Sequence, residues 1–169
     1  MSSSLSTACR LLRREAAEGA RLAREAYKSH RDDPTTLGFI GVAVGYLDRD
    51  YEFARNAIDR AIVLNPNSAT LLSRKAYFEN WMENTSVAEA CIRRAVRLSP
   101  LDPEMGWFHF GLANALMKAG RWDEALTEAL ASIREIPEFV PGYMPVIRCL
   151  VELARVVQPR IGTPICLCD

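Results

Sequence analysis

The sequence predicts an all-α protein in which antiparallel helix pairs stack side by side into a solenoid. Three segments carry the same markers, a series of alanines and aliphatic residues that ends in a proline. They run from Ala54 to Pro66, from Ala88 to Pro100 and from Ala125 to Pro137. Their first alanines are 34 and then 37 residues apart, and their prolines repeat the same two steps. A fixed period of this length is typical of helix–turn–helix repeats.

The residue types in these segments explain why such helices would stack. Small or apolar side chains recur every three or four positions, which is the pattern of an amphipathic helix. Alanine lets two helix axes approach closely where they cross, and proline ends a helix because it lacks an N–H group. We therefore expect turns between units at 65–68 and 99–103, and we expect the second turn to hold the three extra residues of the longer step.

A second helical stretch precedes each of these segments, so the units read as helix pairs. The expected first helices are Thr36–Leu47, Ala69–Met82 and Met105–Ala119, and the turns inside the pairs are 48–50, 83–86 and 120–123. Arg10–His30 is expected to be the second helix of a pair whose first helix is missing. Pro141–Val157 is expected to be the first helix of a pair whose second helix is missing. The predicted division is 1–34 (half-repeat helix), 35–68, 69–105 and 106–139 (complete units, the middle one with the longer turn), 140–158 (capping helix) and 159–169 (tail).

The third unit carries the most specific pattern. From Leu112 to Ala125 it has the order leucine, small residue, leucine, glycine, aromatic residue and Asp-Glu-Ala, and so resembles the tetratricopeptide repeat family. The resemblance covers residues 10–157 and implies a right-handed superhelical solenoid. The chain departs from the family at Glu83, where a turn glycine is usual, and at Gly38 and Gly41, where larger apolar residues are usual.

The resemblance also implies a concave groove that is lined by the first helices. The residues expected to face it are Phe39, Ala43, Tyr46, Ser73, Arg74, Tyr77, Asn80, Trp107, Phe110, Asn114, Met117, Met144 and Arg148. Such a groove is rich in aromatic side chains and poor in charge, which favours an apolar helix or an extended peptide as its occupant. The alternative is that some of these residues, Phe39 and Tyr46 above all, belong to the core between repeats.

Two finer resemblances bear on the partner. The carboxylate clamp of chaperone-binding repeats needs Lys and Asn in the first unit, where this chain has Phe39 and Ala43, so that partner class is not supported. The amino-acid sequence of residues 38–51 and of the turns 65–67 and 98–103 is similar to that of repeat regions attached to bacterial adenylate/guanylate cyclases and winged-helix regulators. This resemblance concerns an attached region and not cyclase activity.

Composition and charge narrow the function classes. Lys plus Arg and Asp plus Glu number 21 each, so the net charge is zero and the basic excess of a nucleic-acid binder is missing. The longest apolar run, Leu37–Leu47, is about half of the roughly 20 residues that a membrane-spanning helix needs. Residues 1–7 are mostly serine and are followed by charged residues, which does not fit a signal peptide. We expect a cytoplasmic protein that binds neither nucleic acid nor membrane.

The chemically reactive residues form no convincing catalytic or metal set. The cysteines Cys9, Cys91, Cys149, Cys166 and Cys168 are scattered without metal-ligand spacing, and the last two are expected to be incidental thiols in a tail. His109 lies among aromatic residues and is expected to be a packed or surface imidazole. Gly38, Gly41 and Gly45 have helical spacing and lack the Gly-Lys-Ser/Thr of a phosphate loop, so close helix packing explains them better. We expect no cofactor and no metal.

Three functions follow from this reading. The first is a non-enzymatic scaffold that binds a peptide or protein in its groove. The second is a regulatory or oligomerisation segment of a bacterial signalling protein such as an adenylate cyclase, in which copies associate through the unfinished ends. The third is an enzyme, which would require a deep pocket that gathers several titratable groups.

Overall fold

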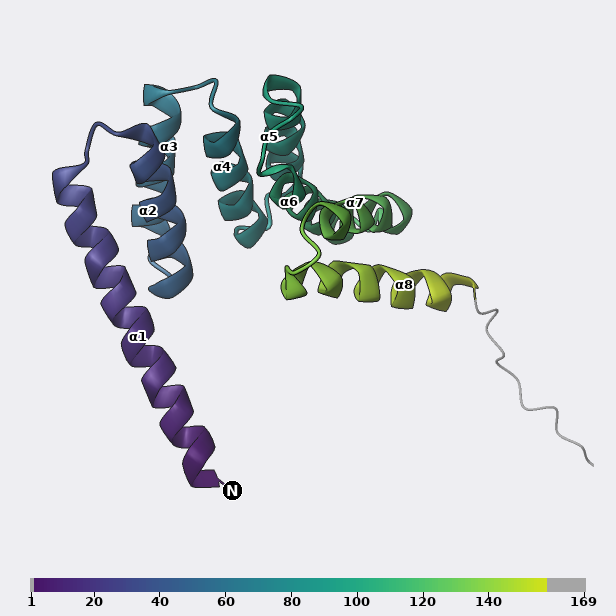
Figure 1. Cartoon of the computed structure of the whole chain (residues 1–169), viewed down its shortest axis with the longest axis horizontal. Helices are drawn as coiled ribbons and strands as arrows, with labels where there is room; N and C mark the ends of the chain where they lie inside the picture. The colour runs from purple at the N-terminus through teal and green to yellow at the C-terminus, as the bar shows by residue number, and fades with distance from the viewer. Residues whose placement is uncertain (1, 158–169) are drawn as a thin grey trace, which may run out of the picture.

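The computed structural model describes residues 2–157 of the chain and the side chains of residues 11–155. The described part is helical and has no strand (Figure 1). Its elements are α1 (Ser2–Ser29), α2 (Pro34–Leu47), α3 (Tyr51–Leu64), α4 (Ala69–Trp81), α5 (Thr85–Leu98), α6 (Met105–Lys118), α7 (Trp122–Glu135), the short 3-10 helix η1 (Val140–Gly142) and α8 (Tyr143–Val157).

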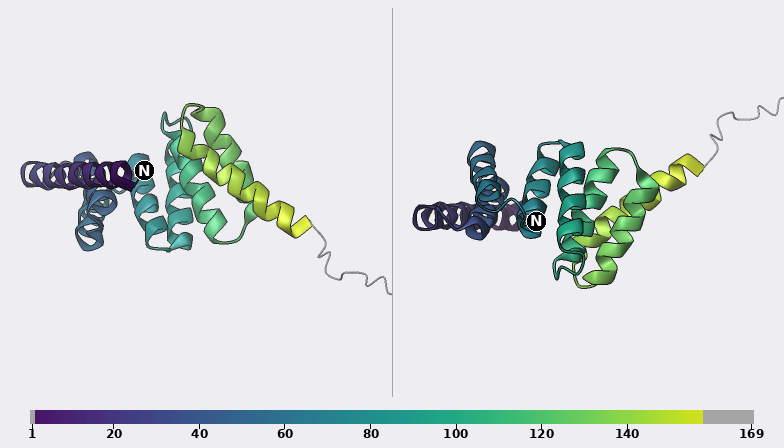
Figure 2. Two further views of the ribbon diagram at one scale, coloured as in Figure 1. Left: turned by 90° about the horizontal axis from the view of Figure 1, so that it is seen from below. Right: turned by 90° about the horizontal axis from the view of Figure 1, so that it is seen from above.

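The helices form three antiparallel pairs with one further helix at each end. α2 packs with α3, α4 with α5 and α6 with α7, while α1 packs on α2 and α8 on α7. The first helices α2, α4, α6 and α8 also contact one another in succession, so together they make one face of the stack. The helix axes turn progressively from α1 to α8 (Figure 2). The predicted all-α solenoid of antiparallel pairs is confirmed.

Close approach between helices is built on small residues, as the sequence predicts. Ala54, Ala88 and Ala125 are fully buried at equivalent places in the second helices. The glycines of α2 do the same for the first pair: a Cβ on Gly38 would lie 2.6 Å from Leu71 Cδ2, and one on Gly41 would lie 2.6 Å from Ile58 Cγ1. The departure from larger apolar residues at these two glycines therefore brings α2 closer to α3 and α4.

Several helices begin earlier than the sequence indicated. α2 begins at Pro34, because proline suits the first helical position and the Asp33 carboxylate accepts hydrogen bonds from the N–H groups of Thr35 and Thr36. α5 and α7 begin inside the predicted turns, at Thr85 and Trp122. In α7 the acidic residues that follow Trp122 stabilise the positive end of the helix dipole.

Both terminal helices differ from their expected bounds. α1 extends from Ser2 rather than from Arg10, so that its first half projects beyond the end of α2 (Figure 1). The expected helix from Pro141 is divided into η1 and α8, because Pro141 has no N–H to donate and favours a tight first turn. The predicted tail at 159–169, with Cys166 and Cys168, lies outside the described residues.

The three extra residues of the longer repeat step also lie in different places from those predicted. The connection 99–104 is two residues longer than the connection 65–68. The third extra residue lies in a helix, because α6 has 14 residues and α4 has 13. The turn therefore absorbs only part of the added length.

A residue with positive φ closes the first helix of every pair. Arg49, Glu83 and Gly120 have φ angles of 56°, 62° and 74°. This left-handed conformation suits Gly120 because glycine has no Cβ, but it costs an ordinary L-residue roughly 1–2 kcal/mol. The turn geometry is thus the same at Glu83, where the glycine that is usual in the family is missing, and the backbone of Glu83 is strained.

We predict that Glu83→Gly stabilises the protein by about 1 kcal/mol, because glycine relieves the left-handed strain. Among the described residues, the Glu83 carboxylate makes one ion pair, an exposed one at 3.5 Å from Lys118 Nζ, and its loss costs little. Urea unfolding measures the change, and Gly120→Ala provides the opposite test, with a loss of similar size. A Glu83→Gly variant less stable than the natural chain would contradict the strain.

Candidate functional site

The face formed by the first helices contains two adjacent hollows. The larger, of about 380 Å³, is lined by Phe39, Val42, Arg74, Tyr77, Trp81, Glu104 and Trp107. The smaller, of about 170 Å³, is lined by Tyr77, Asn80, Trp81, Phe110, Asn114 and Lys118. Tyr77 and Trp81 of α4 belong to both, so the hollows adjoin along α4 and together reach from α2 to α6. We call this surface the groove.

Aromatic rings cover most of the α4–α6 side of the groove. Tyr77 lies 6.3 Å from Phe110 and 6.5 Å from Trp107, measured between ring centroids. Phe139, from the connection before η1, packs on Trp107 at 4.2 Å and on Phe110 at 5.1 Å. Several of these pairs meet edge to face, the arrangement that aromatic quadrupoles prefer. The rings therefore hold one another in fixed orientations.

A hydrogen bond fixes Tyr77 at the junction of the two hollows. Its hydroxyl donates to the carbonyl oxygen of Trp107 at 2.7 Å and so ties α4 to α6. Burial raises the pKa of Tyr77 far above its ordinary value, because the phenolate would lose its water. Tyr77 is thus a neutral, positioned ring at any physiological pH.

The larger hollow also contains a largely buried ion pair. Arg74 of α4 donates to Glu104 at 2.6 Å, and its guanidinium lies over the Phe39 ring, 4.4 Å from the centroid. The longer connection 99–104 supplies Glu104 at the start of α6. A charge that is paired in this way contributes little free charge to the surface, so the hollow is apolar in character despite its arginine.

Amide groups line the smaller hollow. Asn80 donates from Nδ2 to the Gly111 carbonyl at 2.9 Å, and Asn114 donates to the Phe110 carbonyl at 2.8 Å. The Lys118 ammonium donates a hydrogen bond to the backbone carbonyl oxygen of Asn80. The bonds of Asn80 and Lys118 join α4 to α6, whereas that of Asn114 stays within α6. Asn80 Oδ1 is buried and accepts no hydrogen bond from the described residues.

The structure brings most of the sequence-predicted groove residues together. Seven of them line the two hollows: Phe39, Arg74, Tyr77, Asn80, Trp107, Phe110 and Asn114. Tyr46 is 72% exposed and lies 6.0 Å from Trp81 between ring centroids, at the edge of the groove. Neither Phe39, at 46% exposed, nor Tyr46 is buried in the core between repeats.

Other predicted groove residues lie elsewhere. Met117 is buried in the main core cluster, because its position on α6 faces inward. Ser73 is likewise fully buried. Arg148 extends along α8 toward Trp122, with its guanidinium 6.0 Å from that ring, and so lies away from both hollows. Ala43 and Met144 do not line them either.

The groove includes residues that the sequence reasoning missed. Trp81 lies one helical turn after Tyr77, so helical spacing could have identified it, and Val42 follows Phe39 by three positions in the same way. Lys118 lies one turn after Asn114 on α6. Glu104 comes from a connection, where helical periodicity gives no signal. The same holds for Phe139, which packs on the rings of Trp107 and Phe110 but lines neither hollow.

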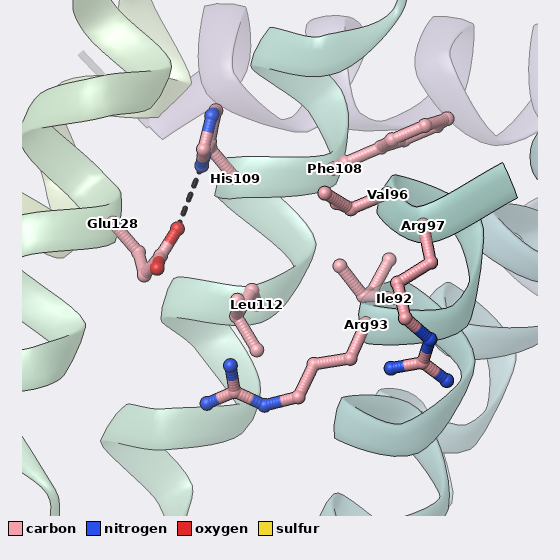
Figure 3. A pocket seen from close by; sticks show the side chains of 8 residues that line it. All are labelled: Ile92, Arg93, Val96, Arg97, Phe108, His109, Leu112 and Glu128. Atoms are coloured by element: carbon pink, nitrogen blue, oxygen red, sulfur yellow. Dashed lines mark hydrogen bonds and ion pairs between the residues drawn. The ribbon is translucent and has the colours of Figure 1, made fainter. Parts of the chain in front are cut away.

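A third hollow, of about 260 Å³, lies between α5, α6 and α7 (Figure 3). His109 Nδ1 and Glu128 Oε2 are 2.6 Å apart at its side, and the remaining lining is Ile92, Arg93, Val96, Arg97, Phe108 and Leu112. This lining offers no hydroxyl or thiol that His109 could activate. The pair joins α6 to α7, which agrees with the predicted packed imidazole.

The described residues contain no cluster of three or more His, Cys, Asp or Glu side chains that could hold a metal. Burial raises the pKa of the thiols of Cys91 and Cys149 above the ordinary value, so both stay protonated at neutral pH. None of the helices within 2–157 is both long enough and apolar enough to span a bilayer.

Comparison with solved structures identifies the fold. The chain is similar to MamA 41-end from Desulfovibrio magneticus RS-1, with 21% identity over 88% of this chain and 82% of that one and a TM-score of 0.62. It is similar to the Arabidopsis OM64 TPR domain, with 17% identity over 68% of this chain and 93% of that one and a TM-score of 0.59. The chain has the tetratricopeptide fold. The predicted right-handed superhelical solenoid is therefore confirmed.

A third likeness covers a larger protein. PilF of Pseudomonas aeruginosa matches with 14% identity over 87% of this chain and 65% of that one, at a TM-score of 0.68. No protein-family model matches the sequence, and no curated protein does. At these identities the likenesses establish the fold and leave the partner open. They contain no link to cyclases, which stays a prediction.

We predict that Glu104→Gln destabilises the protein by about 1–3 kcal/mol, because Arg74 would keep its charge in a largely buried place without a counter-charge. Urea unfolding provides the measurement. Glu25→Gln serves as the control, since it removes an exposed pair with Arg21 and should change stability by less than about 0.5 kcal/mol. Equal stability of the Glu104→Gln variant and the natural chain would contradict the role of the ion pair.

Proposed function

We propose that the protein is a non-enzymatic scaffold whose groove binds an apolar stretch of a peptide or protein partner. The observation that carries the proposal is the pair of adjoining hollows, of about 380 and 170 Å³, on the first-helix face. Concave surfaces lined by aromatic side chains provide large contact area at a small cost in side-chain entropy. The tetratricopeptide fold supports a protein-interaction role in general.

The charge pattern of the groove favours an apolar occupant. Arg74 is paired with Glu104, and Lys118 is directed toward the Asn80 carbonyl and Glu83. The apolar lining left for a partner includes the rings of Phe39, Trp81 and Phe110. A strongly acidic or basic peptide would find no excess of opposite charge there, whereas a leucine or phenylalanine side chain would bury its surface against rings.

The polar atoms beneath the rings are closed to a partner. Asn80 Oδ1 and Arg74 Nε make no hydrogen bond with the described residues, and both are shielded from solvent. An occupant would therefore contact the rings and not these atoms, so burial of apolar side chains would have to supply most of its affinity.

A displayed library of random peptides, selected on the purified full chain, tests this function. We expect the recovered peptides to share apolar or aromatic residues, and we expect Phe39→Ala and Phe110→Ala each to weaken their binding at least tenfold. Binding would also change the fluorescence of Trp81 and Trp107, which lie in the groove.

Val63→Ala is the matched control, since Val63 is an exposed apolar residue at the end of α3 that lines neither hollow. It should leave peptide affinity unchanged. Selected peptides that bind the two groove variants and the natural chain equally well would show that the groove is not the binding surface.

A further inference from the structure

An apolar stripe runs along the outer side of α8. Met144 is 65% exposed and Ile147 is 56% exposed, and both lie on the arc that Leu150 and Val151 continue. Because these positions recur every three or four residues, they share one side of the helix. The opposite side is buried through Cys149, so α8 is apolar on two sides. The buried side packs on α7 and α6, and α8 lies at the end of the row of helices (Figure 1).

In every complete unit a second helix covers one side of the first helix. α3 packs on α2, α5 on α4 and α7 on α6. α8 follows α6 in the row of first helices, yet among the described residues no second helix of its own pair packs on it. Exposed stripes of this extent on one element are typical of interaction surfaces.

At the other end of the stack, α1 is a second helix, and the described residues contain no first helix to pair with it. It packs on α2 as α3 packs on α4 and α5 on α6, which is the place of a second helix. Leu22 lies seven residues before the end of α1, as Cys91 does in α5 and Glu128 in α7. At this position Cys91 shares a hollow with Leu72 of α4, and Glu128 contacts His109 of α6. Such a residue therefore faces the first helix of its own pair.

On α1 that side is uncovered. Leu22 is 51% exposed there and borders a hollow of about 470 Å³. Leu11 lines the same hollow, and Gly19 lies where it borders α2, since a Cβ there would be 2.9 Å from Leu47 Cδ1. The surface is therefore a hollow along a helix with leucines and charged side chains in its lining, and it has room for larger side chains from a neighbouring helix.

We propose that α1 of a second copy of this chain docks on the outer stripe of α8 and completes its helix pair. Each end supplies what the other lacks, because α8 is a first helix that presents large apolar side chains and α1 is a second helix with a hollow. The 28 residues of α1 span about 42 Å and the 15 of α8 about 22 Å, so α1 is long enough to cover α8 completely.

The borders of the two surfaces carry charges of both signs. Arg14, Glu15 and Glu18 line the hollow on α1, and Glu18 is already paired within that helix. On α8, Arg155 is paired within the helix, whereas Arg148 makes no ion pair among the described residues. Glu15 makes none either, so contact between the two ends would leave one carboxylate and one guanidinium to meet at the rim of an apolar centre. This arrangement, an apolar core with a charged rim, is usual for protein interfaces.

The contact joins two different surfaces and is therefore heterologous. Each copy keeps one free α1 and one free α8 after pairing, so chains of copies grow with concentration unless they close into a ring. A symmetric dimer through two α8 stripes would instead stop at two copies. The two arrangements respond differently to a substitution that blocks only one of the two surfaces.

Complementation between two damaged copies tests the proposal on the full chain. Leu22→Glu blocks the α1 surface and Ile147→Glu blocks the α8 surface, and light scattering after gel filtration measures the mass. We expect the natural chain to associate with rising concentration and each variant alone to be a monomer. An equal mixture of the two variants should form a dimer, because it contains one intact surface of each kind.

Leu101→Glu controls for the charge itself, since Leu101 is an exposed residue in the connection before α6, and it should associate as the natural chain does. Circular dichroism verifies that each variant is folded, and Leu22→Gln with Ile147→Gln repeats the mixture without added charge. A natural chain that is monomeric at every concentration would overturn the proposal. So would a Leu22→Glu variant that still associates alone, or a mixture that stays monomeric.

Discussion

The structure depends on how closely its helices approach one another. Fully buried alanines at matching places in α3, α5 and α7, and glycines on α2, leave no side chain to hold the axes apart. Because each unit has the same small residues at nearly the same step, each pair is placed on the previous one by a similar rotation. The superhelix is the accumulated result of these local contacts.

The groove follows from that arrangement. Second helices that pack tightly through small residues leave the first helices to carry the large ones, and the aromatic residues of α2, α4 and α6 meet on one side. Hydrogen bonds from Tyr77 and Asn80 to the backbone of α6 tie adjacent units together under these rings. The same side chains thus stabilise the stack and shape the surface that a partner would contact, while the ends of the stack keep apolar surfaces of their own.

Periodicity predicted the helix pairs, and together with the resemblance to the tetratricopeptide family it predicted most of the groove residues. It placed helix ends less well, because caps such as Asp33 and Pro34 and the left-handed turn at Glu83 are local events that do not repeat. It could not find Glu104, which lines the groove, or Phe139, which packs on the groove rings, because both lie in connections. It also assigned Met117 to the groove, although helical spacing alone does not tell which of two adjacent sides faces the core.

The most direct test of the close-packing claim is the free energy of unfolding of Ala88→Leu and Ala125→Leu, measured in urea. Both alanines are fully buried, so the larger side chain must push two helices apart, and each variant should lose about 1–3 kcal/mol. Ala90→Leu, at an exposed position on α5, should change stability by less than about 0.5 kcal/mol. If both buried variants instead unfold at the same urea concentration as the natural chain, small residues do not set the helix spacing.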